Sequence, residues 1–170
     1  MFVDETKARG YTVAAAVFAD AELNRARRAL EDLRLSGQKR IHFVKENNSR
    51  RRLILSELAA LGTKAYLYHV DGQDAATSRH LCLEALVKDA AESGAERIVL
   101  ELDEQIRRQD ERSLHLATHR LGVEVRYSHE QASAEPLLWA ADAVAWSYRK
   151  GSDWSRRIKP MVIAARLLLP

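Results

Sequence analysis

Three acidic residues lie inside apolar segments that should belong to the core of the folded chain. Asp4 follows the hydrophobic start of the sequence, Glu101 lies within R-I-V-L-E-L-D-E, and Asp142 lies within L-L-W-A-A-D-A-V-A-W. Burying a carboxylate without a partner is costly, so such groups pair with cations, accept hydrogen bonds or coordinate metals. Because the three acids sit on separate segments, we expect the fold to gather them at one site. Such a site can hold divalent cations for phosphoryl chemistry.

Segments with strand-like and helix-like patterns alternate along the chain. The predicted strands are Phe2 to Glu5, Tyr11 to Phe18, Ile41 to Val44 (short or merely extended), Thr63 to Val70, Arg97 to Leu102 and Val123 to Tyr127. The predicted helices are Ala21 to Leu35, Ser49 to Leu61, Asp74 to Glu92, Arg107 to Leu121 and Ala134 to Tyr148. The stretch from Asp153 to Pro170 is predicted to be helical in part, with an interruption at Pro160. This order predicts an α/β layered fold. The first two strands can form a hairpin around Gly10, so the sheet should be mixed.

Length and composition favour one globular domain. The 170 residues suffice for a single domain, 1–170, in which 153–170 forms a C-terminal extension. Cys82 is the only cysteine, which excludes an intramolecular disulfide and a cysteine zinc site within one chain. No leader and no apolar run of membrane-spanning length is evident, so a cytoplasmic protein without a membrane partner is expected. The apolar segments 161–163 and 167–169 should cover the core or dock on a partner, which could be a second copy.

The basic residues permit a nucleic-acid partner without requiring one. The net charge is only +3, and the sequence pI is about 9.1. Several arginines are clustered, however, and these are candidates for contacts with backbone phosphates. They are Arg50, Arg51, Arg52, Arg107, Arg108 and Arg112. The alternative is that each cluster is an ordinary solvated surface.

Asp142 has the clearest pattern among the acids. On a helix, its neighbours at three and four residues are all apolar, so its side chain should project from the face that packs on the sheet. The alternative is a buried aspartate that accepts backbone hydrogen bonds or pairs with an arginine. Glu135, two helical turns earlier, lies on roughly the same face.

The alternation of side chains along a strand predicts which face of the sheet each strand acid occupies. Glu101 shares one face with Val99 and Asp103, and Asp103 sits at the strand end, so Glu101 is the better internal ligand. Asp4 and Glu5 point to opposite faces, so only one of them can join Glu101 directly. An isolated acid at a strand end could equally be a solvated loop residue.

The remaining polar candidates surround two predicted strand ends. His42, Lys45 and Glu46 lie close together in the sequence, and His129 follows a later strand pattern. Such groups can bind phosphate, position water or protonate a leaving group, or they can be ordinary strand-end residues. The G-x-S-x-G, G-x-x-x-x-G-K-[ST] and G-x-G-x-x-G motifs are absent, which argues against a serine hydrolase and against these nucleotide-binding loops.

Four motifs together resemble a known family. The segments F-V-D-E-T, R-I-H-F-V-K-E, I-V-L-E-L and E-P-L-L-W-A-A-D-A-V-A-W are similar to those of a large uncharacterised family of bacterial ribonuclease-H-like proteins, closest to an actinobacterial subgroup. The resemblance extends from Phe2 to about Trp154, and Thr6 replaces the usual serine after the acid pair. It implies a ribonuclease-H-like three-layer fold in which helices flank a mixed central sheet.

The resemblance also implies a catalytic role for the acids. Asp4, Glu101 and Asp142 would hold two Mg²⁺ or Mn²⁺ ions. The fourth acid would be one of three glutamates, and a basic side chain could assist at the phosphate or the leaving group. The glutamates are Glu5, Glu46 and Glu135, and the basic candidates are His42, Lys45 and His129. The expected activity is hydrolysis of phosphodiester bonds in RNA or DNA.

Two other functions stay open at this point. One is a non-catalytic module on the same scaffold that binds nucleic acid or protein. The other is a metal-dependent hydrolase of a small phosphorylated compound. The sequence argues against the familiar aspartyl-phosphate phosphatases, because Glu5 and Thr6 follow Asp4 where a D-x-D motif would be needed.

Overall fold

A mixed β-sheet lies at the centre of the computed structural model, which describes residues 1–7 and 10–169. Among these residues the sheet has six strands: β1 (Phe2–Thr6), β2 (Tyr11–Val17), β3 (Lys64–Val70), β4 (Arg97–Glu101), β5 (Arg126–Glu130) and β6 (Val162–Leu168). Their order is β5-β4-β1-β2-β3-β6. β2 is antiparallel to β1 and β3, whereas the other neighbouring pairs are parallel. The predicted mixed sheet and its opening hairpin are therefore present.

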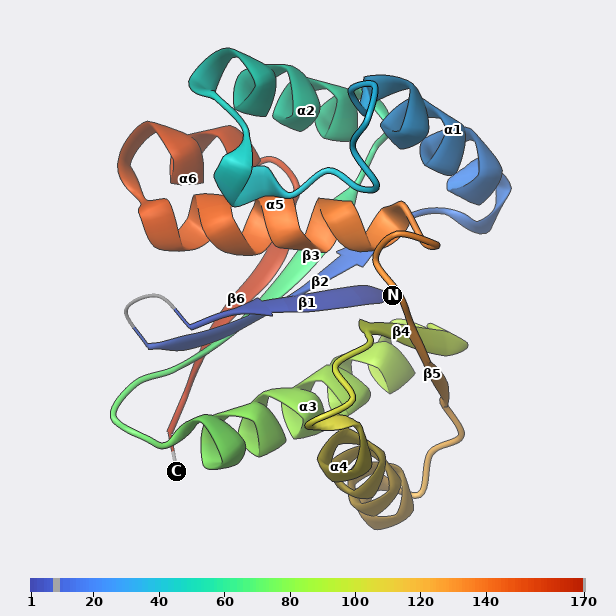
Figure 1. Cartoon of the computed structure of the whole chain (residues 1–170). Helices are drawn as coiled ribbons and strands as arrows, with labels where there is room; N and C mark the ends of the chain where they lie inside the picture. Colours follow the sequence, from blue (N-terminus) through green and yellow to red (C-terminus); the bar gives the residue numbers. More distant parts are fainter. Residues whose placement is uncertain (8–9, 170) are drawn as a thin grey trace.

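Helices cover both faces of the sheet and give three layers (Figure 1). On one face lie α1 (Leu23–Leu33), α2 (Asn48–Ala60), α5 (Leu137–Lys150), α6 (Ser152–Ile158) and two short 3₁₀ turns, η1 (Asp20–Glu22) and η2 (Phe43–Lys45). On the other face lie α3 (Ala75–Glu92) and α4 (Arg107–Leu121). Successive side chains of β1 point to opposite faces of the sheet. Phe2 therefore packs in the core under α5, and Val3 packs in the core over α3.

Local signals in the sequence set several helix ends. The side chain of Asn47 accepts a hydrogen bond from the backbone N–H of Arg50 and caps α2. Asp74 caps α3 by accepting from the N–H groups of Ala76 and Thr77. Gly122 ends α4 in the left-handed conformation, with φ of +64°. Gly122 ends α4 where the sequence predicts, whereas the cap of α2 is Asn47, two residues before the start predicted at Ser49.

The structure corrects the prediction of a strand or extended piece over Ile41 to Val44. This segment does not join the sheet, and Phe43–Lys45 forms the 3₁₀ turn η2 instead. Ile41 and Phe43 are buried in the core against α5. Their partner is a helix rather than a strand, which patterning over four residues cannot reveal.

Two further strands differ from the prediction. β5 begins three residues later than expected and includes His129, because its register with β4 pairs Leu100 with His129. The C-terminal stretch was expected to be partly helical, and α6 ends at Ile158, but the chain then forms β6 parallel to β3. The final residue of that predicted stretch, Pro170, lies outside the described residues.

An ion pair attaches the edge strand β6 to α3. Asp89, which is only 2% exposed, accepts two hydrogen bonds from Arg166 at 2.5 and 2.8 Å and one from the Tyr68 hydroxyl at 2.9 Å. Three apolar side chains of this segment remain more than half exposed: Ile163, Leu167 and Leu169. The docking of a second copy on this edge stays a prediction. In the described part of the chain, no helix is both long and apolar enough to span a membrane.

Candidate functional site

Asp4 and Glu101 lie beside each other on the sheet face that α5 covers. β1 and β4 are parallel, with Phe2 opposite Val99 and Val3 opposite Leu100, so the next residues along both strands are Asp4 and Glu101. Phe2 and Val99 belong to the core under α5, and side chains two residues apart on a strand share a face. Both carboxylates therefore project toward α5 from adjacent strands.

Asp142 enters the same region from α5. Its Oδ2 accepts a hydrogen bond from the backbone N–H of Phe43 at 2.9 Å, and the Nδ1 atom of His42 lies 3.4 Å away. The turn η2 thus fixes the orientation of the carboxylate and places a histidine next to it. About 17% of the Asp142 side chain remains exposed, so the group is still reachable from solvent.

Arg40 occupies the position next to Glu101. Its guanidinium donates to Glu101 Oε1 at 2.7 Å, and both side chains are partly exposed. A shallow hollow of about 420 Å³ opens over this pair, lined also by Lys39, Leu102 and Ser133 among others. Arg40 was missed as a site residue from the sequence, because nothing in the local pattern distinguishes it from the neighbouring basic residues.

The negative charges of the other acids act on Asp4. The pKa of Asp4 is raised well above its ordinary value, first by burial and then by the negative charges of Glu101, Asp142 and Glu5. A hydrogen bond from the backbone N–H of Glu5, at 2.7 Å, offsets only part of this. Carboxylates that repel one another in a half-buried position are stabilised when a cation binds between them.

This repulsion predicts that Asp4→Asn stabilises the fold at neutral pH. Below the ordinary pKa of 3.8, Asp4 is protonated in both the folded and the unfolded chain. As the pH rises further, the unfolded chain ionises first, so folding stability falls until the pH passes the raised folded-state pKa. The variant cannot ionise and should gain about 0.5–2 kcal/mol at neutral pH, the usual scale for relieving a strained functional site.

Urea unfolding of the wild type and of Asp4→Asn at several pH values measures this effect. The stability difference should be small near pH 3.8 and grow toward neutral pH. A difference that is constant with pH, or a variant less stable than the wild type at neutral pH, would contradict the electrostatic account.

Glu5 lies on the other side of the sheet. Arg79 donates to its Oε2 at 2.8 Å, and Lys7 lies 3.9 Å from its Oε1. Arg79 also donates to the Tyr11 hydroxyl at 2.9 Å and makes a two-point ion pair with Asp110. The structure therefore does not bring Glu5 to the other acids; it is held in a buried ion network under α3 and α4.

The other two candidates for a fourth acid also have structural partners. Glu46 is 5% exposed and accepts hydrogen bonds from Gln38 at 3.0 Å and Arg50 at 3.1 Å. Glu135 accepts from Arg27 at 2.9–3.1 Å and from the backbone N–H of Leu137 at the start of α5. Both side chains are used to connect elements of the α5 layer.

The basic candidates fall into separate places. His129 lies on β5 and contacts Asp110 Oδ2 at 3.1 Å, in the buried network on the far face of the sheet. His42 is next to Asp142, as described above, and Lys45 is exposed on η2. Of the three, His42 is the one that contacts an acid of the site.

The arginine clusters are divided between the two helix layers. Arg50, Arg51 and Arg52 lie on α2, in the layer that contains α5. Arg107, Arg108 and Arg112 lie on α4, across the sheet from α5 (Figure 1). Only the α2 cluster therefore shares a layer with Asp142.

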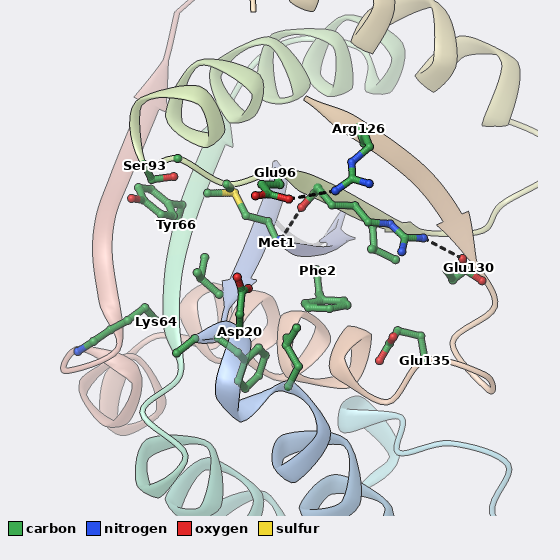
Figure 2. Close-up of a pocket in the computed structure, with 18 of the residues that line it drawn as sticks. Met1, Phe2, Asp20, Lys64, Tyr66, Ser93, Glu96, Arg126, Glu130 and Glu135 are labelled. Carbon is green, nitrogen blue, oxygen red and sulfur yellow. Dashed lines mark hydrogen bonds and ion pairs between the residues drawn. The ribbon is translucent and has the colours of Figure 1, made fainter. Parts of the chain in front are cut away.

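A pocket of about 860 Å³ lies away from the three acids, where β1 and β4 begin (Figure 2). Charged side chains at its rim pair with one another, Arg126 with Glu96 at 3.0 Å and Arg97 with Glu130 at 3.5 Å. Glu135 is the one proposed site acid that lines it. We therefore place the candidate site at the acids rather than in this larger cavity.

The donor chemistry of the acid site suits a hard divalent cation, because all three side chains offer carboxylate oxygens. Within residues 1–7 and 10–169, no three His, Cys, Asp or Glu side chains are placed to hold a metal ion together. The contact of Glu101 with Arg40 accounts for part of this, since the carboxylate is turned toward the guanidinium.

The fold is similar to that of a known structure. A chain in the structure of the PCNA:RNase HII complex from Archaeoglobus fulgidus matches with a TM-score of 0.59 at 17% sequence identity. The match covers 88% of this chain and 70% of that chain. No family model and no curated protein matches. The ribonuclease-H-like fold predicted from the sequence is confirmed, whereas membership of the bacterial subgroup stays a prediction.

Proposed function

We propose that this protein is a divalent-metal-dependent nuclease that hydrolyses phosphodiester bonds of RNA or DNA. The observation that carries the proposal is the arrangement of Asp4, Glu101 and Asp142, which reach one face of the sheet from β1, β4 and α5. The similarity of the fold to a chain of a complex that contains RNase HII supports it. The motifs that resemble the bacterial ribonuclease-H-like family point the same way.

Asp4, Glu101 and Asp142 are the residues that would hold Mg²⁺ or Mn²⁺. When bound, the metal supplies an activated water and stabilises the charge of the leaving oxygen. The backbone N–H of Phe43 keeps the Asp142 carboxylate oriented, because it donates to Oδ2 and leaves Oδ1 available. Arg40 holds Glu101 by a charge-assisted hydrogen bond before the site is loaded.

His42 is the side chain best placed to move a proton in this site. Its Nδ1 atom lies 3.4 Å from Asp142 Oδ2, and about a third of the side chain is exposed. A protonated imidazole beside a carboxylate can donate a proton to a leaving oxygen. Lys45, three residues further along the chain, is exposed and would contact phosphate.

One observation favours a second function. Arg40 already supplies a cation to Glu101, which is what a non-catalytic binding module on this scaffold would need to be stable without metal. The two functions differ in their response to metal, since only the nuclease should cleave its ligand.

The test is cleavage of labelled oligonucleotides in millimolar Mg²⁺ or Mn²⁺ and, in parallel, in excess EDTA. Single-stranded RNA, single-stranded DNA, both duplexes and an RNA–DNA hybrid cover the substrate choice that the site leaves open. We expect cleavage with metal and none with EDTA, and heat release on titration of Mn²⁺ into the protein. Protein that binds no divalent ion at millimolar concentration would refute the proposal, and binding of nucleic acid without cleavage would favour the non-catalytic module.

A further inference from the structure

A stripe of side chains leads away from Asp142 along α5. Asp142, Trp146 and Lys150 follow at intervals of four residues, so they lie one above the other on the same side of the helix. The ring of Trp146 packs edge-on against Phe43 with a centroid distance of 5.3 Å. Phe43 is the residue whose N–H donates to Asp142, so the stripe begins inside the candidate site.

Cations gather on the two tryptophan rings that continue this stripe. The Arg51 guanidinium lies 4.3 Å from the centroid of Trp146, and Lys150 Nζ lies 5.9 Å from it. Trp154 of α6 is 5.5 Å from Trp146, and two more guanidinium groups lie over it, Arg52 at 5.8 Å and Arg157 at 6.0 Å. We call the cations on and beside these rings the basic surface: Arg51, Arg52, Lys150, Arg156 and Arg157.

The charge of the basic surface is only partly neutralised within the protein. Asp153 supplies the carboxylate of its ion pairs, 2.7 Å from Arg157 and 3.7 Å from Arg156. The pKa of Asp153 is lowered by the hydrogen bond from Arg157 and by the charges of Arg157, Arg156 and Arg52. Five cations against one acid make this surface strongly positive, although the whole chain carries a net charge of only +3.

The side chains of the basic surface have different roles, structural for Arg51 and available for a ligand for the exposed cations. Arg51 donates to the backbone oxygens of Phe43 and Val44, at 3.1 and 2.6 Å, and so holds the turn η2. Arg52, Lys150 and Arg157 are exposed and keep donors for a ligand. Stacking on an aromatic ring restricts a guanidinium without using up its N–H groups, so less entropy is lost on binding an anion.

The extent of the surface matches a polymer of phosphates. Lys150 lies eight residues beyond Asp142, which is about 12 Å along a helix that rises about 1.5 Å per residue. Neighbouring phosphates of one nucleic-acid strand are farther apart than the rise of roughly 3.4 Å per nucleotide along a duplex axis, so about two or three of them span this distance. A mononucleotide or a small phosphate ester at the acids would not reach the far cations.

We propose that the basic surface binds the phosphates of the two or three nucleotides on one side of the bond to be cleaved, which makes a polynucleotide strand the substrate. This inference rests on the proposed function for the position of that bond. The nucleic-acid track is then the face formed by α2, the end of α5 and α6. The arginines of α4 lie outside this track.

Binding measured in EDTA tests the track separately from catalysis. The probe is a fluorescein-labelled single strand of about 12 nucleotides, and the readout is anisotropy at several salt concentrations. The variant carries Arg52→Ala, Lys150→Ala and Arg157→Ala, and the matched control carries Arg107→Ala, Arg108→Ala and Arg112→Ala on α4. We expect the track variant to lose at least about tenfold in affinity, with a salt slope shallower by about two to three units, and the control to bind like the wild type.

The outcomes separate the two proposals. Affinity should rise with oligonucleotide length until about three phosphates are covered, and a mononucleotide should compete poorly. Equal binding by the track variant, an equal loss in the α4 control, or equal competition by poly-glutamate would overturn the inference. If the track variant were poorly folded by circular dichroism, Arg156→Gln with Arg157→Gln on α6 alone gives the same test. Normal binding by the wild type together with absent cleavage would refute the nuclease proposal and leave the track in place.

Discussion

Asp142→Asn should reduce metal-dependent cleavage by at least about 10³-fold while the protein stays folded. The amide has the size of the carboxylate, and its oxygen can still accept the hydrogen bond from the Phe43 N–H. What it loses is the negative charge that a divalent cation needs as a ligand. Initial rates of oligonucleotide cleavage in Mn²⁺, with thermal unfolding as the folding check, measure the effect.

Asp103→Asn is the matched control for this variant. Asp103 lies two residues beyond Glu101, and its carboxylate accepts a hydrogen bond from the backbone N–H of Gln105 at 2.9 Å. The same change of charge there should leave the cleavage rate within a few-fold of the wild type. An Asp142→Asn protein that retains more than about a tenth of the wild-type rate would show that Asp142 is not a metal ligand of the reaction.

Arg79→Met should destabilise the fold by about 3–5 kcal/mol, the largest stability effect that we expect from a single substitution. Arg79 is buried, and its guanidinium makes ion pairs with Asp110 and Glu5 and a hydrogen bond to Tyr11. Methionine fills similar space but removes the guanidinium that both Asp110 and Glu5 contact. Urea unfolding measures the loss.

The exposed pair on α4 is the control for this second prediction. Arg107 lies 3.0 Å from Glu111, and both side chains are more than two fifths exposed, so Arg107→Met should cost at most about 0.5 kcal/mol. A loss below about 1 kcal/mol for Arg79→Met would mean that water or movement of the helices satisfies the buried acids.

The ion network around Asp110 also determines how the stability of the fold changes as the pH falls. Burial acts to raise the pKa of Asp110, but hydrogen bonds from Arg79 and His129 outweigh it, so the pKa lies below the ordinary 3.8. The stability that ionised Asp110 contributes is therefore complete above pH 3.8 and is lost as the pH falls through the lowered value. Asp4 acts in the opposite sense, because its pKa is raised.

Strong local patterns predicted much of the fold. The hairpin β1–β2, the buried strand β4 and the helices α3 and α4 follow from alternation, continuous apolar runs and helical spacing, with Gly122 at the end of α4. The strand β6 was missed, because Val162 to Leu168 has apolar residues on both sides and no period that separates strand from helix. Its identity depends on pairing with β3, and an ion pair between Arg166 and Asp89, 77 residues apart, anchors it.

The same reasoning from the sequence predicted only part of the candidate site. Alternation along β1 already required Asp4 and Glu5 to point to opposite faces, but it could not tell which of them would meet Glu101. Glu46 and Glu135 were equally plausible candidates. Glu135 pairs with Arg27, 108 residues away, a contact that no local pattern shows, whereas Glu46 pairs with Arg50, four residues further along the chain. Arg40, which pairs with Glu101 across 61 residues, carried no signal at all.

The sequence by itself determined that acids would be embedded in the core on three separate elements, because apolar neighbours at strand and helix spacing oblige their side chains to point inward. Only the tertiary structure decided which acids meet. The parallel register of β1 with β4 puts Asp4 beside Glu101, and the packing of α5 across them brings in Asp142. Register and helix packing depend on contacts between residues about a hundred positions apart, and local periodicity contains no information on such contacts.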